Sequence, residues 1–287
     1  MSEIQNIQWF PGHMTKTRRM ISANMKLVDA VVELIDARIP LSSRNPEIDA
    51  LVYSKPRLIV MNKCDMADAQ QTQKWLNYFK NKGISAIAAD CKSGSGLNAF
   101  LPAIRKLLSE LIAKRKAKGM STGTLHIMIL GIPNVGKSSL INKLAKQKRA
   151  KVEDRPGVTR TKQWVKLSDD IELLDTPGVL WPKFEDMAVG ERLAFIGSVN
   201  DDILDIESLA ARLVETLRFD YKENIIKRYS IDYDDNDSNF DIIEKIARKR
   251  GMLISGGEVN FERAAITILD EFRSAKLGRI TLEHCDG

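Results

Sequence analysis

Short apolar runs alternate with amphipathic stretches between residues 29 and 178. The apolar runs are bounded by turn-forming or charged residues and predict buried strands over 29–38, 55–63, 83–90, 123–131 and 171–178. Apolar positions at helical spacing predict helices over 68–83, 96–119 and 136–147. Strands that alternate with helices form a mainly parallel sheet with helices on both faces, so we expect an α/β domain.

The pattern changes in the last third of the chain, where helical periodicity replaces the strand signal, for example over 206–220 and 260–278. We therefore expect an α/β domain over residues 1–184 and a small all-helical domain over 185–287. The acidic segment 232–241 lies between two helical stretches and predicts an exposed loop.

Charge follows the same division. Residues 1–184 contain 30 Lys and Arg against 16 Asp and Glu, whereas residues 185–287 contain 14 against 22. The first part is strongly basic, which suits a polyanionic partner such as nucleic acid, because each cation set against a phosphate releases counterions. A solubilising surface is the alternative explanation.

The sequence indicates neither a membrane segment nor a cysteine-based site. No apolar run approaches the roughly 20 residues that a membrane helix requires, and the N-terminus lacks the charged-then-apolar order of a secretory signal. Cys64, Cys91 and Cys285 are widely separated and form no C-x-x-C pair. We expect a cytoplasmic protein with reduced thiols.

Residues 131–139 (GIPNVGKSS) form the clearest motif. Gly131, Gly136, Lys137 and Ser138 match G-x-x-x-x-G-K-[ST] between a predicted strand and a predicted helix, which is the context of a phosphate loop. The glycines let backbone N–H groups approach phosphate oxygens, the lysine neutralises the terminal phosphates and the serine binds Mg²⁺. The predicted phosphate-binding residues are Asn134, Val135, Gly136, Lys137, Ser138 and Ser139.

Two later segments fit the same site. At the end of a predicted strand, Asp175 of DTPG would hold Mg²⁺ through water, and the N–H of Gly178 would meet the γ-phosphate. Thr159 is the expected switch threonine on Mg²⁺, with Thr161 as the alternative. The predicted Mg²⁺ ligands are thus Ser138, Thr159 and Asp175.

The motif that would identify the base comes earlier, in MNKCD. A carboxylate at Asp65 accepts both N1–H and N2–H of guanine, while Asn62 bonds locally and the Lys63 stem covers the ring. The motif stands at the end of a predicted strand, which favours a guanine-binding role over an ordinary polar turn.

Residues 89–96 (ADCKSGSG) follow the next predicted strand and occupy the place of the Ser-Ala-Lys-like loop that supports the base. The triplet here is Asp90, Cys91 and Lys92, and we expect Cys91 and Lys92 to contact the nucleotide. The order of motifs is therefore a cyclic shift of the usual GTPase order. Such a shift preserves the site if the old termini are joined, here by residues 97–119.

These motifs resemble those of one known family, the circularly permuted GTPases of the YlqF/RbgA type, over nearly the whole chain. The stretches are WFPGHMTKTRRM, DARIPLSSRNP, NKCD, GIPNVGKSS, RPGVTRTKQW, DTPGVLWPK and LGRITLE. The resemblance implies a GTPase that binds GTP and GDP with Mg²⁺, assembles with the maturing large (50S) ribosomal subunit, is stimulated by it and leaves after hydrolysis. We expect contacts with ribosomal RNA and proteins, and a monomer that binds no membrane.

The catalytic group is less evident than the binding site. Val179 and Leu180 follow DTPG, and neither can hold a water molecule by hydrogen bonding. The resemblance implies that His13 positions the attacking water in the particle-bound state; a surface histidine is the alternative. It also links Asn134 to a K⁺ ion beside the phosphates, with a helix-capping residue as the alternative. The candidate catalytic residues are His13, Lys137 and Thr159.

Basic clusters would contact RNA, expected to be ribosomal RNA recognised by shape. They lie at 13–26, 113–119, 146–151 and 245–250. Any one is more often a solvated helix face, but several in one chain favour phosphate contacts.

Other functions stay open. A permuted GTPase of small-subunit assembly is one. Such relatives commonly carry a zinc-binding cysteine cluster, and this sequence has none. A GTP-dependent RNA-binding switch with negligible turnover is another, and it is supported by Val179. An ATPase is disfavoured by Asp65.

Overall fold

The computed structural model describes residues 19–45, 49, 51, 52, 54–119, 123–146, 164–174, 186–199, 201 and 205–285. The chain separates into two compact units. One contains the described residues up to 174 together with 283–285, and the other contains the described residues from 186 to 282. The last described residues therefore pack with the first unit, whereas the sequence assigned all of 185–287 to the helical domain.

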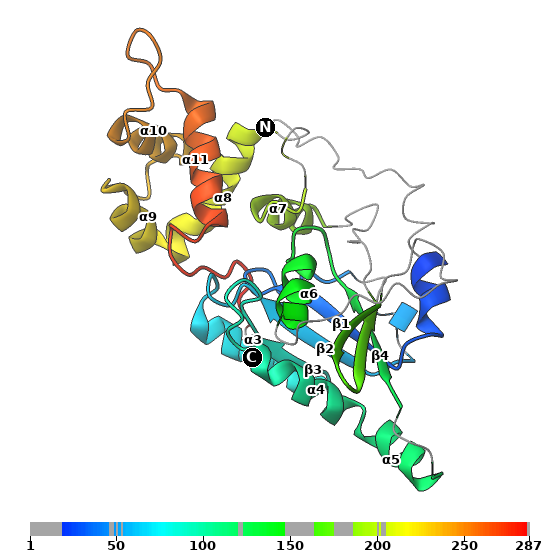
Figure 1. The fold of residues 1–287 in the computed structure, drawn as a ribbon. Helices are drawn as coiled ribbons and strands as arrows, with labels where there is room; N and C mark the ends of the chain where they lie inside the picture. Colours follow the sequence, from blue (N-terminus) through cyan, green and yellow to red (C-terminus); the bar gives the residue numbers. More distant parts are fainter. Residues whose placement is uncertain are drawn as a thin grey trace. The chain divides into compact units, whose positions relative to one another are not determined.

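The first unit is built on one sheet, with six strands among the described residues (Figure 1). They are β1 (Ala30–Asp36), β2 (Arg57–Asn62), β3 (Ser85–Ala88), β4 (Leu125–Leu130), β5 (Trp164–Ser168) and β6 (Ile171–Leu174). The order is β3-β2-β1-β4-β6-β5, and only the β5–β6 pair is antiparallel. The predicted α/β fold with a mainly parallel sheet is confirmed.

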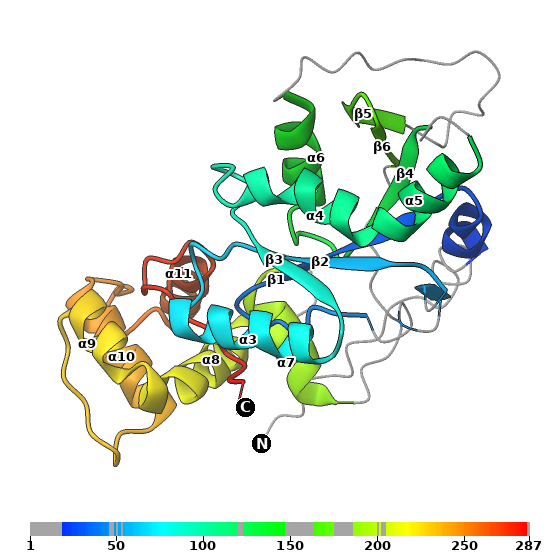
Figure 2. The ribbon, with the colours of Figure 1, turned by 90° about the horizontal axis from the view of Figure 1, so that it is seen from below.

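Helices cover both faces of this sheet. Figure 2 shows α3 (Ala69–Asn81) on one face, and α4 (Phe100–Leu107) and α6 (Lys137–Lys146) on the other. Because it is covered on both faces, β1 is buried at all seven positions, which explains why five of its seven residues are apolar. On the α3 side, Ile35 and Met61 pack in one cluster with Trp75.

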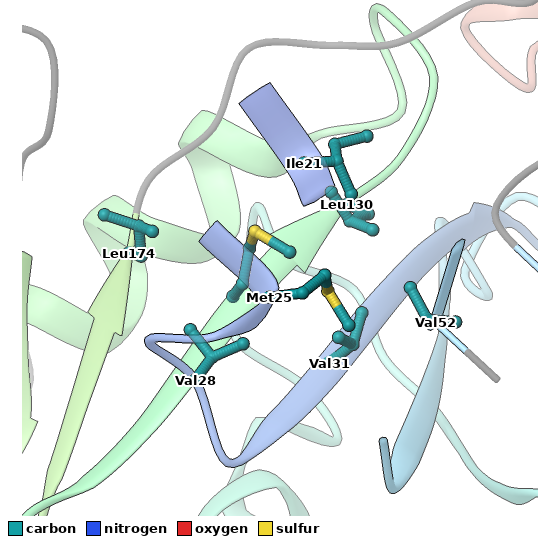
Figure 3. Packing of buried hydrophobic residues seen from close by; sticks show 8 residues of the cluster. Ile21, Met25, Val28, Val31, Val52, Leu130 and Leu174 are labelled. Carbon is teal, nitrogen blue, oxygen red and sulfur yellow. The ribbon is translucent and has the colours of Figure 1, made fainter. Parts of the chain in front are cut away.

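A second apolar cluster lies on the same side of β1, nearer its start (Figure 3). Ile21 and Met25 are four residues apart in the helical segment 19–25 and therefore face the same way. They pack against Val31 of β1 and Leu130 of β4. This packing fixes the end of the basic N-terminal stretch to the sheet.

The connection from β3 to β4 joins the two parts of the permuted order. It consists of the short 3₁₀ helix η1 (Leu97–Ala99), α4 and α5 (Ser109–Ala117). The prediction of one helix over 96–119 was wrong, because the chain turns at Leu108, which is buried and has φ −99° and ψ 14°. Arg115 of α5 forms an ion pair with Asp29 at 2.9 Å and so holds this helix to the start of β1.

The sequence did not predict β5, which forms a hairpin with β6. Its pattern, WVKLS, is short, and the two residues between the strands are Asp169 and Asp170. The Ser168 hydroxyl donates to the Asp170 carboxylate at 2.6 Å and stabilises the turn. Arg105 of α4 also donates to both carboxylate oxygens of Asp170, each at 2.8 Å.

The second unit is helical throughout its described part. Its helices are α7 (Met187–Phe195), α8 (Ile206–Asp220), α9 (Lys222–Tyr229), α10 (Asn239–Lys249) and α11 (Phe261–Arg273). The acidic segment 232–241 begins after α9 and ends within α10, where Ser238 and Asp241 form a reciprocal capping box. Its last three residues, 239–241, are thus helical and not part of the predicted loop.

Candidate nucleotide site

The predicted site residues that the structure describes lie near the carboxyl edge of the sheet. β1 ends at Asp36 beside the end of β2 at Asn62, and β4 leads directly into the phosphate loop. The strand order reverses between β1 and β4, and open α/β sheets bind ligands outside the strand ends at such a point.

Two glycines of the phosphate loop are required by close neighbours. A side chain at Gly131 would begin 2.6 Å from the carbonyl oxygen of Leu34 in β1. Gly136 has φ +104°, and a side chain there would overlap the amide nitrogen of Asn62. The second glycine therefore permits both the turn of the loop and the approach of the base motif.

Asn62 connects three segments that are distant in sequence. Its Nδ2 donates to the carbonyl oxygen of Val135 in the phosphate loop at 2.6 Å. Its Oδ1 accepts the N–H of Cys91, in the loop after β3, at 2.9 Å. The side chain is buried, so both polar ends are satisfied within the protein. The structure thus joins the NKCD motif, the loop after β3 and the phosphate loop through one amide.

Lys63 is held at its charged end. Its backbone has φ +59°, in the left-handed region, and its Nζ donates to the carbonyl oxygen of Asn134 at 3.1 Å. The same Nζ lies 3.0 Å from Oδ2 of Asp36. The side chain remains 21% exposed, which suits a stem that covers one face of a base.

The sequence did not single out Asp36, the carboxylate that holds Lys63. Asp36 is fully buried and accepts hydrogen bonds from Nε and Nη2 of Arg38, at 3.0 and 2.9 Å. Burial favours the protonated form, but Arg38 and Lys63 together outweigh it and hold the pKa of Asp36 below its ordinary value. The available signal was an aspartate that ends an apolar strand and precedes an arginine by two residues.

The loop after β3 explains the departure from the Ser-Ala-Lys-like triplet. The Asp90 carboxylate accepts the N–H groups of Lys92 and Ser93 at 2.8 and 3.0 Å and thereby closes the turn. Burial raises the pKa of the Cys91 thiol to about 12, so this residue serves the site through its backbone N–H. Lys92 and Asp65 are both exposed, as groups that meet a ligand should be.

The phosphate side of the site is built around the start of α6. Lys137 donates from Nζ to the carbonyl oxygens of Gly131 and Ile132, at 3.1 and 2.9 Å, so its charge lies over the loop. Ser138 and Ser139 follow in the first helical turn with exposed side chains. Asn134 is exposed, with φ +58°.

Several predicted residues lie outside the described part of the chain. They are His13, Thr159, Thr161, Asp175 and Gly178. Of the expected Mg²⁺ ligands, only Ser138 is described, and its exposed hydroxyl beside Lys137 is a hard oxygen donor that fits this ion.

The basic clusters differ in how their charges are used. Lys114 and Lys116 of α5 and Lys118, the residue that follows this helix, are exposed. In α10, by contrast, Lys245 pairs with Asp237 at 2.6 Å and Arg248 with Glu244 at 2.7 Å. The α10 cluster is therefore partly neutralised, and α5 presents the more available cations. No described helix combines the length and apolar character needed to cross a membrane.

Comparison with protein families matches part of the chain to a known family model. The model described as a 50S ribosome-binding GTPase matches residues 126–239, and the match begins in β4, the strand that leads into the phosphate loop.

Comparison with individual proteins extends over nearly the whole chain. The chain is 47% identical to ribosome biogenesis GTPase A of Bacillus cereus, over 96% of this chain and 93% of that protein. It is 35% identical to mitochondrial ribosome-associated GTPase 1 of Mus musculus, over 96% and 90%. The crystal structure of GNP-bound YlqF from T. maritima matches with a TM-score of 0.66 and 27% identity, over 94% and 99%.

Proposed function

The chain belongs to the family of ribosome biogenesis GTPase A, and from this premise we propose that it binds the maturing large (50S) ribosomal subunit, hydrolyses GTP in a late assembly step and leaves after hydrolysis. The chain is a GTP hydrolase. The observation that carries the residue assignment is the position of Asn62, which bonds at once to the phosphate loop and to the base-supporting loop.

On the base side, we assign guanine recognition to the exposed carboxylate of Asp65. Two N–H groups on the guanine edge would donate to it, a pairing that adenine does not offer. Lys63 would cover one face of the ring with its stem, because its ammonium is fixed by Asp36 and by the Asn134 carbonyl.

On the phosphate side, Lys137 would move from the loop carbonyls to the terminal phosphates and neutralise their charge. Ser138, with Thr159 and Asp175, would hold Mg²⁺, which neutralises charge that develops on the phosphate oxygens. The N–H of Gly178 would sense the γ-phosphate.

For hydrolysis, we assign the positioning of the attacking water to His13, because Val179 after DTPG has no hydrogen-bonding side chain. Asn134, at the surface of the phosphate loop, would provide an oxygen for K⁺. A cation there would offset developing charge in the way an arginine finger does. Turnover should then be faster in K⁺ than in Na⁺ at equal ionic strength, and equal rates would overturn the K⁺ assignment.

The partner surface includes the exposed lysines of α5. If Lys114, Lys116 and Lys118 face ribosomal RNA phosphates, replacing all three by glutamine should weaken subunit binding and reduce its salt dependence. An unchanged slope of affinity against salt would show that α5 lies outside the interface.

The decisive experiment is sedimentation with separated ribosomal subunits, in GDP and in a non-hydrolysable GTP analogue. We expect co-sedimentation with the large subunit, stronger with the analogue. Binding to the small subunit alone would support the small-subunit alternative, and equal binding in both nucleotides would overturn release after hydrolysis.

Turnover measurements separate an enzyme from a slow switch. We expect the large subunit to stimulate GTP hydrolysis. The stimulated rate of His13→Ala should be lower by about 10²-fold or more, because a positioned acid–base side chain contributes a rate factor of at least this size. GTP affinity should be unchanged. Full stimulated turnover in this variant would remove His13 from the mechanism.

A further inference from the structure

The end of the chain is anchored in the nucleotide-binding unit. The carboxylate of Glu283 accepts the N–H groups of Leu41 and Ser42, at 2.6 and 3.0 Å, and also the Ser42 hydroxyl. The indole N–H of Trp75 in α3 donates to the Glu283 carbonyl at 2.8 Å. Glu283 is buried, and Cys285, two residues on, packs in the apolar cluster beneath α3.

The loop that Glu283 holds is the one that shapes the end of β1. Within it, the Ser43 hydroxyl donates to the carbonyl oxygen of Ile39 at 2.7 Å. The Ser43 Oγ also accepts the N–H of Asp36 at 3.0 Å. Ser43 directly follows Ser42, to which the Glu283 carboxylate is hydrogen-bonded. Glu283 therefore holds in place the segment that in turn is hydrogen-bonded to Asp36.

We propose that Glu283 is a positioning residue of the guanine site, acting through the loop of residues 39–43 and Asp36 on Lys63. The chain of links runs from Glu283 to the N–H of Ser42, through the backbone to Ser43, and from the Ser43 Oγ to the N–H of Asp36. The carboxylate of Asp36 then pairs with Lys63. This inference rests on the proposed assignment of Lys63 to guanine binding.

Three donors converge on the Glu283 carboxylate, and a carboxylate is an acceptor at both oxygens. Glutamine has nearly the same shape but would turn an amide N–H₂ toward at least one of these donors. The loop would then lose an acceptor in a buried place, where unpaired polar groups are costly, and would shift.

The test is a double-mutant cycle on the affinity of the full-length protein for fluorescent GDP. The variants are Glu283→Gln, Lys63→Met and the double variant, with Glu258→Gln as the matched control. Glu258 is an exposed glutamate of the helical unit, so its substitution makes the same charge change away from the tail. Thermal unfolding of each variant reports on folding.

Glu283→Gln should weaken GDP binding by about threefold to tenfold, the range expected for residues coupled to a site through a network. In the Lys63→Met background, the same substitution should change affinity less than about twofold, because the group it positions is gone. Glu258→Gln should bind like the unmodified protein. Ser42→Ala removes one donor from the loop side, and should show the same non-additivity if Glu283→Gln does not fold.

The outcomes separate the two levels of inference. Equal affinity of Glu283→Gln and Glu258→Gln, or an equal loss in both backgrounds, would overturn the positioning role alone. Unchanged GDP affinity in Lys63→Met would instead overturn the assignment of Lys63 to the guanine site.

Discussion

The amide of Asn62 fills the space in which a side chain at Gly136 would begin. The two residues lie in motifs more than seventy positions apart. The turn of the phosphate loop at Gly136 nevertheless packs directly against the Asn62 side chain, which leaves no space for a Cβ atom. The absence of a side chain at Gly136 is therefore a condition for joining the two halves of the nucleotide site.

Replacing Gly136 by alanine should displace Asn62 and break its bonds to Val135 and Cys91. We expect guanine nucleotide affinity to fall at least about tenfold, as the loss of one or two buried hydrogen bonds implies. Gly83→Ala is the matched control, since Gly83 also has positive φ (+71°) but no neighbour near its Cβ position. Each variant should lose about 1–2 kcal/mol from backbone strain. Equal nucleotide binding by both variants would contradict the steric explanation.

Asp65→Asn should change the nucleotide preference of the protein from guanine to xanthine. The amide would keep an acceptor for N1–H but would turn a donor toward position 2, which suits the xanthine carbonyl and opposes the guanine amino group. We expect GDP affinity to fall about tenfold to a hundredfold and XDP affinity to rise, both measured by nucleotide competition. If the substitution changes the affinities for GDP and XDP by the same factor, Asp65 does not contact the base.

Asp36 should make stability depend on pH in the acid range. Its pKa is lowered in the folded state, so its contribution is complete above the ordinary aspartate pKa of about 3.9 and is lost as pH falls toward the folded-state value. Urea unfolding of the unmodified protein and of Asp36→Asn should differ by about 3 kcal/mol at pH 7, because the substitution leaves Arg38 buried without its charge partner. This difference should shrink below about pH 4.

The control for this comparison is Asp169→Asn. Asp169 is 88% exposed and 3.7 Å from Lys166, so its substitution should change stability by less than about 0.5 kcal/mol at any pH. A constant difference between the unmodified protein and Asp36→Asn from pH 7 to pH 3 would show that Asp36 has no lowered pKa.

The three cysteines should differ in reactivity. Burial raises the pKa of Cys91 to about 12, so almost no thiolate exists at pH 8, and Cys285 is buried as well. Cys64, between Lys63 and Asp65, is only half-buried. Iodoacetamide at pH 8 should label Cys64 first in mass spectra of the folded protein, and all three in urea. Rapid labelling of Cys91 before Cys64 would contradict the described burial.

Much of the site follows from local sequence because its elements are set by short-range patterns. The run LHIMIL predicts β4, and the glycines and lysine that follow predict a tight loop at a helix start. Asn62 and Lys63 stand at the end of β2, so their place at the sheet edge follows from strand direction alone. These parts of the site needed no knowledge of distant contacts.

Other features were beyond local patterns. The break at Leu108 contains neither glycine nor proline, so no local signal for it stands in the sequence, and the Leu108 side chain is buried. The role of Asp36 in the site comes from its ion pair with Lys63, which follows β2, whereas Asp36 ends β1. The sequence did not indicate that Lys245 and Arg248 of α10 are paired with Asp237 and Glu244. These ion pairs are visible only in the structure.

The sequence by itself determined five of the six described strands, the helices α3 and α6 and the phosphate loop, because each depends on residues within a few positions of one another. The permuted order of the motifs could be read directly along the chain. Only the tertiary structure decided how these motifs engage: the bonds of Asn62 to Val135 and of Lys63 to Asn134 span 73 and 71 positions, and those of Glu283 to the loop after β1 span more than 240. Such contacts depend on which chain segments the sheet order brings side by side, and no local pattern encodes that choice.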